Sequence, residues 1–266
     1  MSRHRQHQRS AVRRSDSTAD CREDPFAGSL ASPAGERVVA IDALRGVAIA
    51  LMIAYHFCFD LRFYRVIGAD FEHDPFWLGF RALIVTSFML LVGISLVLAD
   101  RAKASPAHFW RRFAVIAGCA LAASAGSYLV FPRTFIYFGI LHCIAVASVL
   151  AWPLTRRPRI AAVVGLAVIA AGLTLAHPAF DQRALSWLGF TTVKPPTEDF
   201  VPLAPWAGVV FIGLALGHAL ALTNFHPLAP LSAASRWLQW LGRHSLAIYM
   251  VHQPVLLGLL WLVVRR

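Results

Sequence analysis

Charged and imidazole side chains are spaced along a single apolar stretch near the start of this sequence, where they could carry out acid–base chemistry. The residues that recur there at intervals of three or four are Asp42, Arg45, Ile49, Met52, His56 and Asp60. This spacing places them on one face of a helix. A carboxylate one turn from an imidazole can fix its tautomer, so we expect Asp60 to orient His56 as a general base. The structural alternative is an Asp42–Arg45 ion pair with His56 at an interface.

A second group with chemical potential is the segment 73–77, followed by Arg81. Pro75 suits the first turn of a helix and Asp74 suits its N-cap, so both have structural explanations. Trp77 can be read as a membrane-interface anchor. His73 has no such explanation, and we therefore expect it to be functional.

Further candidate side chains, three of them imidazoles, lie in later apolar stretches. These candidates are His142, His244, Tyr249, His252 and Gln253. Ser245, Tyr249 and His252 share one helical face because they lie four and three residues apart. We expect His218 to be structural. The histidines show no metal-ligand spacing, so we expect no metal site.

These residues require apolar elements to position them, and the composition indicates that those elements lie in a membrane. Hydrophobic residues make up 58% of the 266 residues and charged residues 15%. The apolar runs cover about 38–59, 77–99, 112–131, 134–153, 159–176, 203–222 and 243–264. Most approach the roughly 20 residues that span a bilayer. The sequence therefore predicts an all-α, polytopic transmembrane bundle of about seven helices over 38–266.

The basic residues predict the orientation of this bundle. Residues 1–37 lack hydrophobic periodicity and are predicted to be a disordered, basic tail. With this tail in the cytoplasm, sixteen Lys and Arg residues fall inside and seven outside, as the positive-inside rule requires. Arg265 and Arg266 fit this orientation poorly. Because the net charge of +11 follows from this placement, we expect no nucleic-acid partner.

Two outer loops are long enough that we expect them to have a function beyond connecting helices. Residues 60–76 carry several acids and His73, and residues 177–202 carry Trp187, Lys194, Glu198 and Asp199.

Several segments together resemble a known family of membrane proteins. They are residues 41–49, 55–57, 73–77, 135–142, 201–206, 241–249 and 252–254. They look like the DUF1624 proteins, which belong with the catalytic domain of heparan-alpha-glucosaminide N-acetyltransferase. The resemblance covers about 38–262. The first helix also resembles the acyltransferase family 3 pattern, in which an Arg, here Arg45, precedes a His, here His56, by eleven residues.

The resemblance implies acetyl or acyl transfer from cytoplasmic acyl-CoA to an amine or hydroxyl of an extracytoplasmic sugar-type acceptor. In the animal enzyme a His in the loop before the second helix is considered catalytic, and His73 stands in the corresponding loop. The sequence thus leaves His73 and His56, with Asp60, as alternative catalytic groups. Arg45 and Asp42 would bind the donor. The supporting residues would be Trp77, Arg81, His142, His244, Tyr249, His252 and Gln253.

Two other functions fit the same polar residues. A transporter for a small metabolite would use the polar face as a pathway, although no inverted repeat is visible. A non-catalytic membrane scaffold is the third hypothesis. For every alternative we expect a multi-pass protein of the cell membrane, which would be the inner membrane of a bacterium. The chain is shorter than the usual transmembrane core of either family, so we expect a reduced fold or assembly into a homo-oligomer.

Overall fold

A computed structural model describes residues 38–264 of the chain, and over this range it forms helices with no named β-strand. The tail predicted at 1–37 and the pair Arg265–Arg266 lie outside the described residues. The prediction of an all-α membrane bundle is confirmed for the described part.

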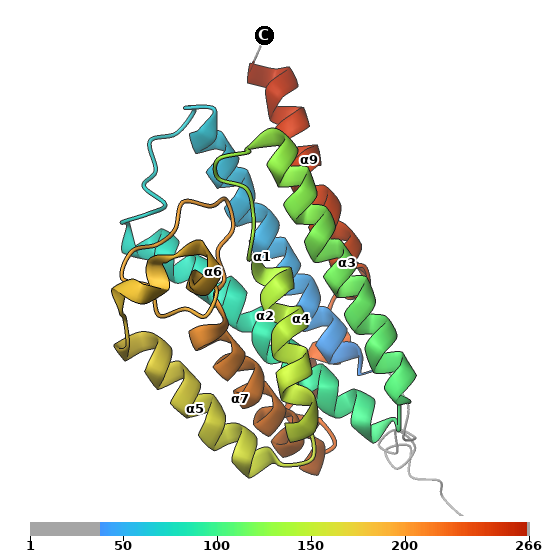
Figure 1. The fold of residues 1–266 in the computed structure, drawn as a ribbon. Helices are drawn as coiled ribbons and strands as arrows, with labels where there is room; N and C mark the ends of the chain where they lie inside the picture. Colours follow the sequence, from blue (N-terminus) through green and yellow to red (C-terminus); the bar gives the residue numbers. More distant parts are fainter. Residues whose placement is uncertain (1–37, 265–266) are drawn as a thin grey trace, which may run out of the picture. The chain divides into compact units, whose positions relative to one another are not determined.

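Seven apolar helices alternate in direction along the chain (Figure 1). They are α1 Val39–Phe63, α2 Pro75–Arg101, α3 Pro106–Val130, α4 Ile140–Ala151, α5 Pro158–Thr174, α7 Leu203–Leu222 and α9 Ser245–Val264. Each corresponds to one of the apolar runs. Five are long and apolar enough to cross a membrane, whereas α4 and α5 are shorter. The 3-10 turn η1 Trp152–Leu154 extends α4. We call the end where α1 begins the inner end, and the end where α1 finishes the outer end.

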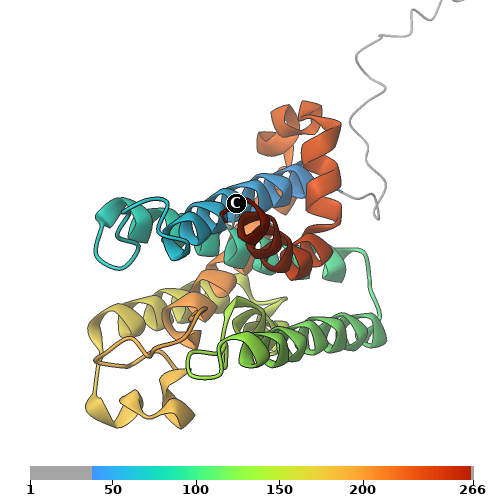
Figure 2. The same cartoon turned by 90° about the horizontal axis from the view of Figure 1, so that it is seen from above.

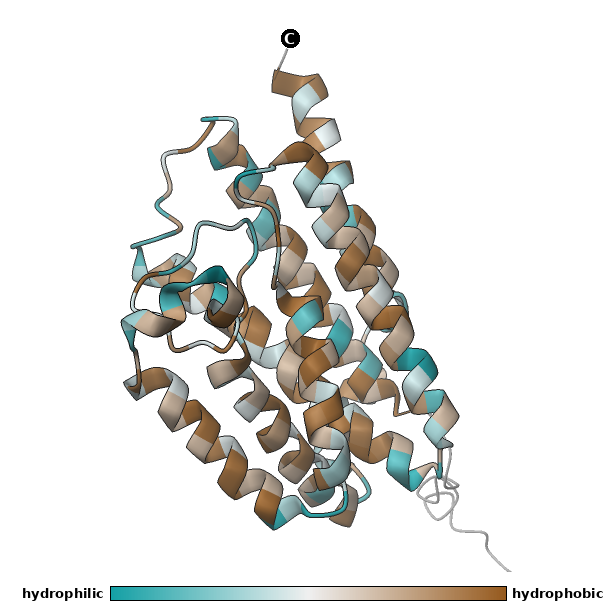
Figure 3. Cartoon of the chain, in the orientation of Figure 1, coloured by the Kyte–Doolittle hydropathy of each residue, from teal (hydrophilic) through white to brown (hydrophobic). Residues whose placement is uncertain are grey.

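The surface of the bundle has the polarity expected for contact with lipid. Figure 3 shows hydrophobic residues along the helices and hydrophilic residues gathered in the loops and near the helix ends. Large apolar side chains such as Leu129 and Leu173 are exposed along α3 and α5. This pattern would be unfavourable in water and is favourable in a bilayer.

Local sequence explains where two of the long helices begin. Asp74 caps α2, since its Oδ1 accepts a hydrogen bond from the amide of Phe76 at 2.9 Å, and Pro75 occupies the first helical position. Ser105 caps α3 in the same way, with Pro106 after it. The prediction that Asp74 is an N-cap is confirmed.

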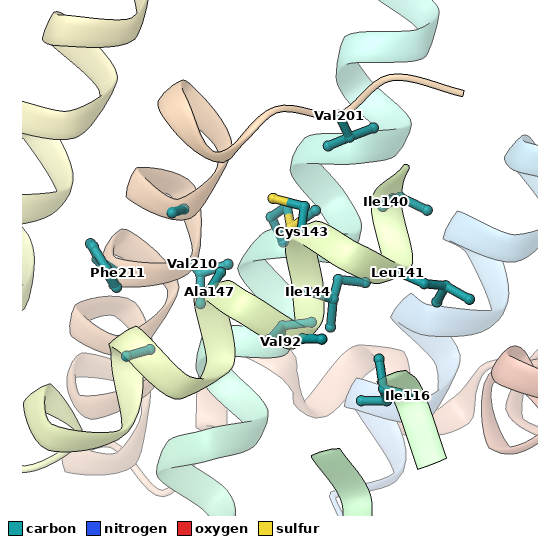
Figure 4. Close-up of a cluster of buried hydrophobic side chains, with 14 of the residues drawn as sticks. Val92, Ile116, Ile140, Leu141, Cys143, Ile144, Ala147, Val201, Val210 and Phe211 are labelled. Atoms are coloured by element: carbon teal, nitrogen blue, oxygen red, sulfur yellow. The ribbon is translucent and has the colours of Figure 1, made fainter. Parts of the chain in front are cut away.

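Helix α4 lies in the core, where it packs against both α2 and α7. Its side chains Cys143, Ile144 and Ala147 pack against Val92 and Val210 (Figure 4). Helices α2 and α7 approach closely because glycines face backbone. A Cβ on Gly93 would overlap the carbonyl of Val210, and one on Gly213 would meet Leu90. Small residues at such crossings allow membrane helices to pack.

Four short elements were not anticipated from the apolar runs. They are η2 Pro178–Asp181, α6 Arg183–Ser186, η3 His226–Ala233 and α8 Arg236–Arg243. Figure 2 shows α8 beside α1, with α5 on the other side of the bundle. Glycines again permit this contact. A Cβ on Gly46 would overlap the carbonyl of Leu238, and one on Gly242 would overlap that of Asp42.

The chain between α3 and α4 turns back into the bundle before α4 begins (Figure 1). Residues 197–201 of the second outer loop run beside this returning segment. The amide of Glu198 donates to the carbonyl of Thr134 at 2.8 Å, and Phe138 and Phe200 form an isolated parallel bridge. Both outer segments are thereby held at the start of α4.

Candidate functional site

A cavity of about 480 Å³ lies among α1, α2, α3, α4 and α9. Its lining residues are Arg45, Phe88, Leu91, Val92, Ser95, His108, Arg111, Arg112, Val115, Ile116, Ile140, Leu141, Ile144, Ser245, Leu246 and Tyr249. The positions of these residues along their helices show that the cavity extends from the inner end of α1 toward the beginning of α4.

The inner end of the cavity is cationic. Arg45, Arg111, Arg112 and His108 all line it, and its described lining contains no acidic side chain. Two of these cations, Arg45 and Arg112, lie near enough for their charges to repel each other. Grouped guanidinium groups on a cavity wall that carries no carboxylate favour an anionic ligand such as a phosphate.

Arg45 is held in place from two sides. Its Nη2 donates a hydrogen bond to Ser95 Oγ on α2 at 2.5 Å, and its Nη1 pairs with Asp42 Oδ1 at 3.1 Å. The hydroxyl of Ser95 in turn donates to the carbonyl of Leu91. These bonds fix the guanidinium at the cavity wall.

Asp42 has a different position from the one predicted. We expected it to bind the donor with Arg45, but it does not line the cavity and its side chain is only 3% exposed. It lies between Arg45 and Arg243, whose Nε is 3.9 Å from Asp42 Oδ2. A buried carboxylate between two guanidinium groups serves to neutralise and position them. The Asp42–Arg45 ion pair given above as the structural alternative is therefore present.

Beyond the cationic end the cavity wall is apolar, and at the outer end it reaches Tyr249 and Ile140. Side chains from α2, α3 and α4 form the wall. Tyr249 Oη donates toward Asp199 Oδ2 at 3.5 Å, and its ring lies 5.5 Å from that of His252. The cavity thus ends one helical turn below His252 on α9.

A buried polar cluster continues this line between α1 and α9. We call His56, Asp60, His252 and Gln253 the α1–α9 polar cluster. Gln253 Nε2 donates to Asp60 Oδ1 at 2.7 Å, and the rings of His56 and His252 are 4.9 Å apart. Four of its buried atoms have no hydrogen-bond partner among residues 38–264: His56 Nδ1, Asp60 Oδ2, His252 Nε2 and Gln253 Oε1. Unsatisfied buried groups are costly and point to a missing ligand or a chemical role.

The predicted pairing of Asp60 with His56 is not formed. The two residues are one turn apart on α1, but Asp60 is bound by Gln253 of α9. The reason is that a neighbouring helix supplies a nearer amide donor, which spacing along a single helix cannot reveal. Asp60 thus joins α1 to α9 and does not orient His56.

The hydrogen bonds of His252 define its tautomer. Its Nδ1 lies 2.6 Å from the carbonyl oxygen of Tyr249, which can only accept, so Nδ1 carries the proton. Nε2 is then an unprotonated acceptor, and it is the atom without a described partner. An imidazole with one nitrogen anchored and the other open is suited to accept a proton.

His142 has the opposite arrangement. Its Nδ1 accepts from the amide of Gly139 at 3.2 Å, so its proton is on Nε2, which lies 3.2 Å from Ser124 Oγ. Ser124 itself donates to the carbonyl of Ile136 at 2.6 Å. Both ring nitrogens therefore hold the returning segment in place. His142 does not line the cavity, so its predicted supporting role stays a prediction.

His73 lies in the outer loop, where its side chain is 82% exposed. Its Nδ1 is 3.0 Å from Asp70 Oδ2. Backbone amides of Glu72 and His73 donate to Asp70, and these bonds with the neighbouring imidazole lower the pKa of Asp70. His73 is therefore separate from the α1–α9 polar cluster, and its role remains a prediction.

Trp77 and Arg81 lie near the outer end of α2. Trp77 packs in an aromatic group with Tyr55 and the buried Phe71, at 6.0 and 4.2 Å between ring centroids. This packing anchors the 64–74 loop over the bundle. The charge of Arg81 acts on both Tyr55 and Asp199, so it contributes positive potential at the outer end of the cavity.

His244 and His218 have structural positions. His244 is exposed between α8 and α9, where its Nδ1 bonds the carbonyl of Trp240 at 2.9 Å. It does not line the cavity, and its predicted supporting role stays a prediction. His218 Nε2 bonds the carbonyl of Thr155 at 2.5 Å, as expected for a structural His.

Two groups of site residues were missed as candidates in the sequence. Arg111 and Arg112 were counted only as loop charges that orient the chain, although they line the cavity. Asp199 was noted only as part of an outer loop, although its Oδ2 accepts from the amide of Ile140 at 2.9 Å. Amphipathic placement of Arg112 at the start of an apolar run was the available signal for the first group. Sequence spacing gives none for Asp199.

The helices and the cavity define a multi-pass membrane protein whose internal site combines an anion-attracting end with buried imidazoles. A family model described as "Heparan-alpha-glucosaminide N-acetyltransferase, catalytic" matches residues 37–254. The chain therefore belongs to this family, as the sequence resemblance indicated, and the family supports acyltransferase chemistry. Comparisons with curated proteins and with solved structures gave no match.

Proposed function

We propose that this protein transfers an acetyl or other acyl group from cytoplasmic acyl-CoA to an amine or hydroxyl of a sugar-type acceptor outside the cell membrane. One observation carries the proposal. A single cavity joins a cationic inner end at Arg45 to Tyr249, which contacts both His252 and Asp199. A donor that enters from inside can thus reach groups that sit in the outer half of the bundle.

The inner end suits the charged part of acyl-CoA. The phosphates would bind Arg45, Arg111 and Arg112, and the pantetheine arm would lie along the apolar wall. Guanidinium groups bind phosphates through paired hydrogen bonds. The thioester would then stand near Tyr249, at the far end from the phosphates.

His252 is the best-placed base for the transfer. As the acceptor nitrogen or oxygen attacks the thioester carbonyl carbon, its proton would pass to His252 Nε2. The carbon–sulfur bond breaks, and the CoA thiolate leaves and takes up a proton. His56, 4.9 Å from His252 between ring centroids, would share that proton. The loop imidazole His73 is the competing base, at the outer surface.

The proposal is tested with purified protein in lipid nanodiscs, radiolabelled acetyl-CoA and a panel of amino sugars and neutral sugars. We expect label to appear in the acceptor with release of one free thiol per transfer. Well-folded protein that neither binds CoA nor transfers label would refute acyl transfer.

Arg112→Gln should weaken use of the donor. Loss of a charge-assisted hydrogen bond to phosphate corresponds to about a tenfold or larger rise in the KM for acyl-CoA. The KM for the acceptor should stay unchanged. Arg101→Gln is the matched control, because Arg101 is exposed at the end of α2 and does not line the cavity. Equal KM values for the two variants would place the donor phosphates elsewhere.

A further inference from the structure

Asp199 is fixed inside the bundle by the loop that carries it. Thr197 Oγ1 donates to the carbonyl of Phe135 at 2.8 Å, and the amide of Glu198 donates to that of Thr134 at 2.8 Å. A Cβ on Gly139 would overlap the carboxylate of Asp199, so glycine is needed for this close approach. The position of Asp199 is therefore set by the hydrogen bonds of the two residues that precede it.

The two oxygens of Asp199 have different surroundings. Oδ2 accepts from the amide of Ile140 at 2.9 Å and from Tyr249 Oη at 3.5 Å. Oδ1 has no hydrogen bond to another residue within 38–264, and the side chain is only partly buried. One oxygen thus holds the carboxylate in place, while the other is available to a ligand.

The carboxylate of Asp199 lies beside the outer end of the cavity. Ile140 and Tyr249, the two partners of Oδ2, both line the outer end of the cavity. The ring of Tyr249 is also 5.5 Å from that of His252. Asp199 and His252 therefore flank one tyrosine from different elements, as a binding group and a base for one substrate would.

Charged and titratable groups surround Asp199 from every neighbouring element. They are Tyr55 of α1, Arg81 of α2, Cys143 of α4, Tyr249 of α9 and Lys194 of its own loop. Burial raises the pKa of Asp199, and its hydrogen bonds together with Arg81 and Lys194 oppose that rise. The ionised carboxylate consequently forms at a higher pH than for an ordinary Asp.

We propose that Oδ1 of Asp199 binds the acceptor, by accepting a hydrogen bond from the N–H or O–H group that is to be acylated. This rests on the acyl transfer proposed above. The carboxylate would hold the reacting nitrogen or oxygen beside His252, and no covalent bond to Asp199 forms. Asp199 is then the residue that selects hydrogen-bond donors at the acceptor position.

Asp199→Asn is the decisive variant. Asn keeps an oxygen for the amide of Ile140 and for Tyr249, but it presents an NH₂ donor where Oδ1 was. We expect the KM for an acceptor such as glucosamine to rise at least about tenfold, with the KM for acetyl-CoA and the thermal midpoint unchanged. Glu198→Gln is the matched control. Glu198 is the exposed residue next to Asp199, and a glutamine there can still accept the hydrogen bond from Thr134 Oγ1. If both variants behave alike, or if Asn mainly lowers the thermal midpoint, the proposal fails.

The pH dependence of acceptor binding, measured on the same three proteins, provides a second test. Because the carboxylate is needed, acceptor binding by the wild type should strengthen as pH rises through the raised pKa of Asp199. Asp199→Asn should lose that dependence, while Glu198→Gln should retain it. An unchanged profile in Asp199→Asn would also overturn the proposal.

Labelling with a hydrophobic carbodiimide tests the site without any turnover. This reagent modifies protonated carboxyl groups that it can reach, so it should label the Asp199 peptide more strongly at lower pH. It should label the peptide less in the presence of glucosamine, without an amide forming between glucosamine and Asp199. Mass spectrometry separates this peptide from that of Asp60. If the wild type transfers nothing but glucosamine protects Asp199, the binding site stands and the proposed function fails. A peptide that is never labelled, or never protected, removes the site itself.

Discussion

His252→Ala should lower the rate of acyl transfer by about 10²–10⁴-fold, the range that a positioned general base contributes. Nε2 of His252 is the unprotonated nitrogen one helical turn beyond the outer end of the cavity, and alanine leaves no group there to take the acceptor's proton. The binding of acetyl-CoA should be unchanged, because the proposed phosphate site lies at the other end of the cavity. Single-turnover transfer and equilibrium CoA binding, measured on the same nanodisc preparation, separate these two effects.

Three other imidazoles serve as comparisons for this variant. His244→Ala should behave like the wild type, since the side chain of His244 is exposed, bonds the carbonyl of Trp240 and does not line the cavity. His56→Ala should lower the rate less than His252→Ala, because its role is to share the proton. If His73→Ala abolishes transfer while His252→Ala remains active, the base is the loop imidazole and the assignment to the α1–α9 polar cluster is wrong.

Gly93→Val should prevent correct assembly of the bundle. Even a single Cβ at Gly93 would overlap the carbonyl of Val210, and the two branches of valine add to that overlap. Backbone at the centre of α7 has no flexible side-chain end that could move aside, so α2 and α7 must separate. We expect a loss of at least about 3 kcal/mol of unfolding free energy, the upper part of the range for overpacked cores.

The measurement is the thermal midpoint and the monodisperse yield after detergent extraction. Gly79→Val is the control on the same helix, because a Cβ at Gly79 meets no atom within 4 Å. The control should be recovered in wild-type amounts. A stable, monodisperse Gly93→Val protein would show that α2 and α7 do not pack as closely as described.

Much of the fold could be predicted because lipid imposes a strong rule on sequence. An apolar run long enough to cross a bilayer is visible without knowledge of its neighbours, so all seven helices were found. The cap at Asp74 was found because it depends only on the next few residues. Helix α8 was missed, since its eight residues mix polar side chains with Trp and Leu and pack against α1 rather than crossing the membrane.

The candidate site was less predictable because its contacts join distant parts of the chain. The stripe from Arg45 to His56 follows from helix periodicity, but the partner of Asp60 depends on how α9 lies against α1. The approach of Asp199 to Ile140 depends on two loops that meet inside the bundle, 59 residues apart in sequence. The role of His142 depends on which nitrogen carries a proton, which residue type alone does not show.

The returning segment before α4 also has an electrical consequence. If the cavity opens toward the cytoplasm as proposed, the insulating layer between Tyr249 and the outer compartment is thinner than the bilayer, and the transmembrane voltage is concentrated across it. Each elementary charge that crosses this layer is driven by about 2.3 kcal/mol per 100 mV. A proton passed from an outer acceptor to the departing thiolate would move inward, so an inside-negative cell would draw the reaction forward.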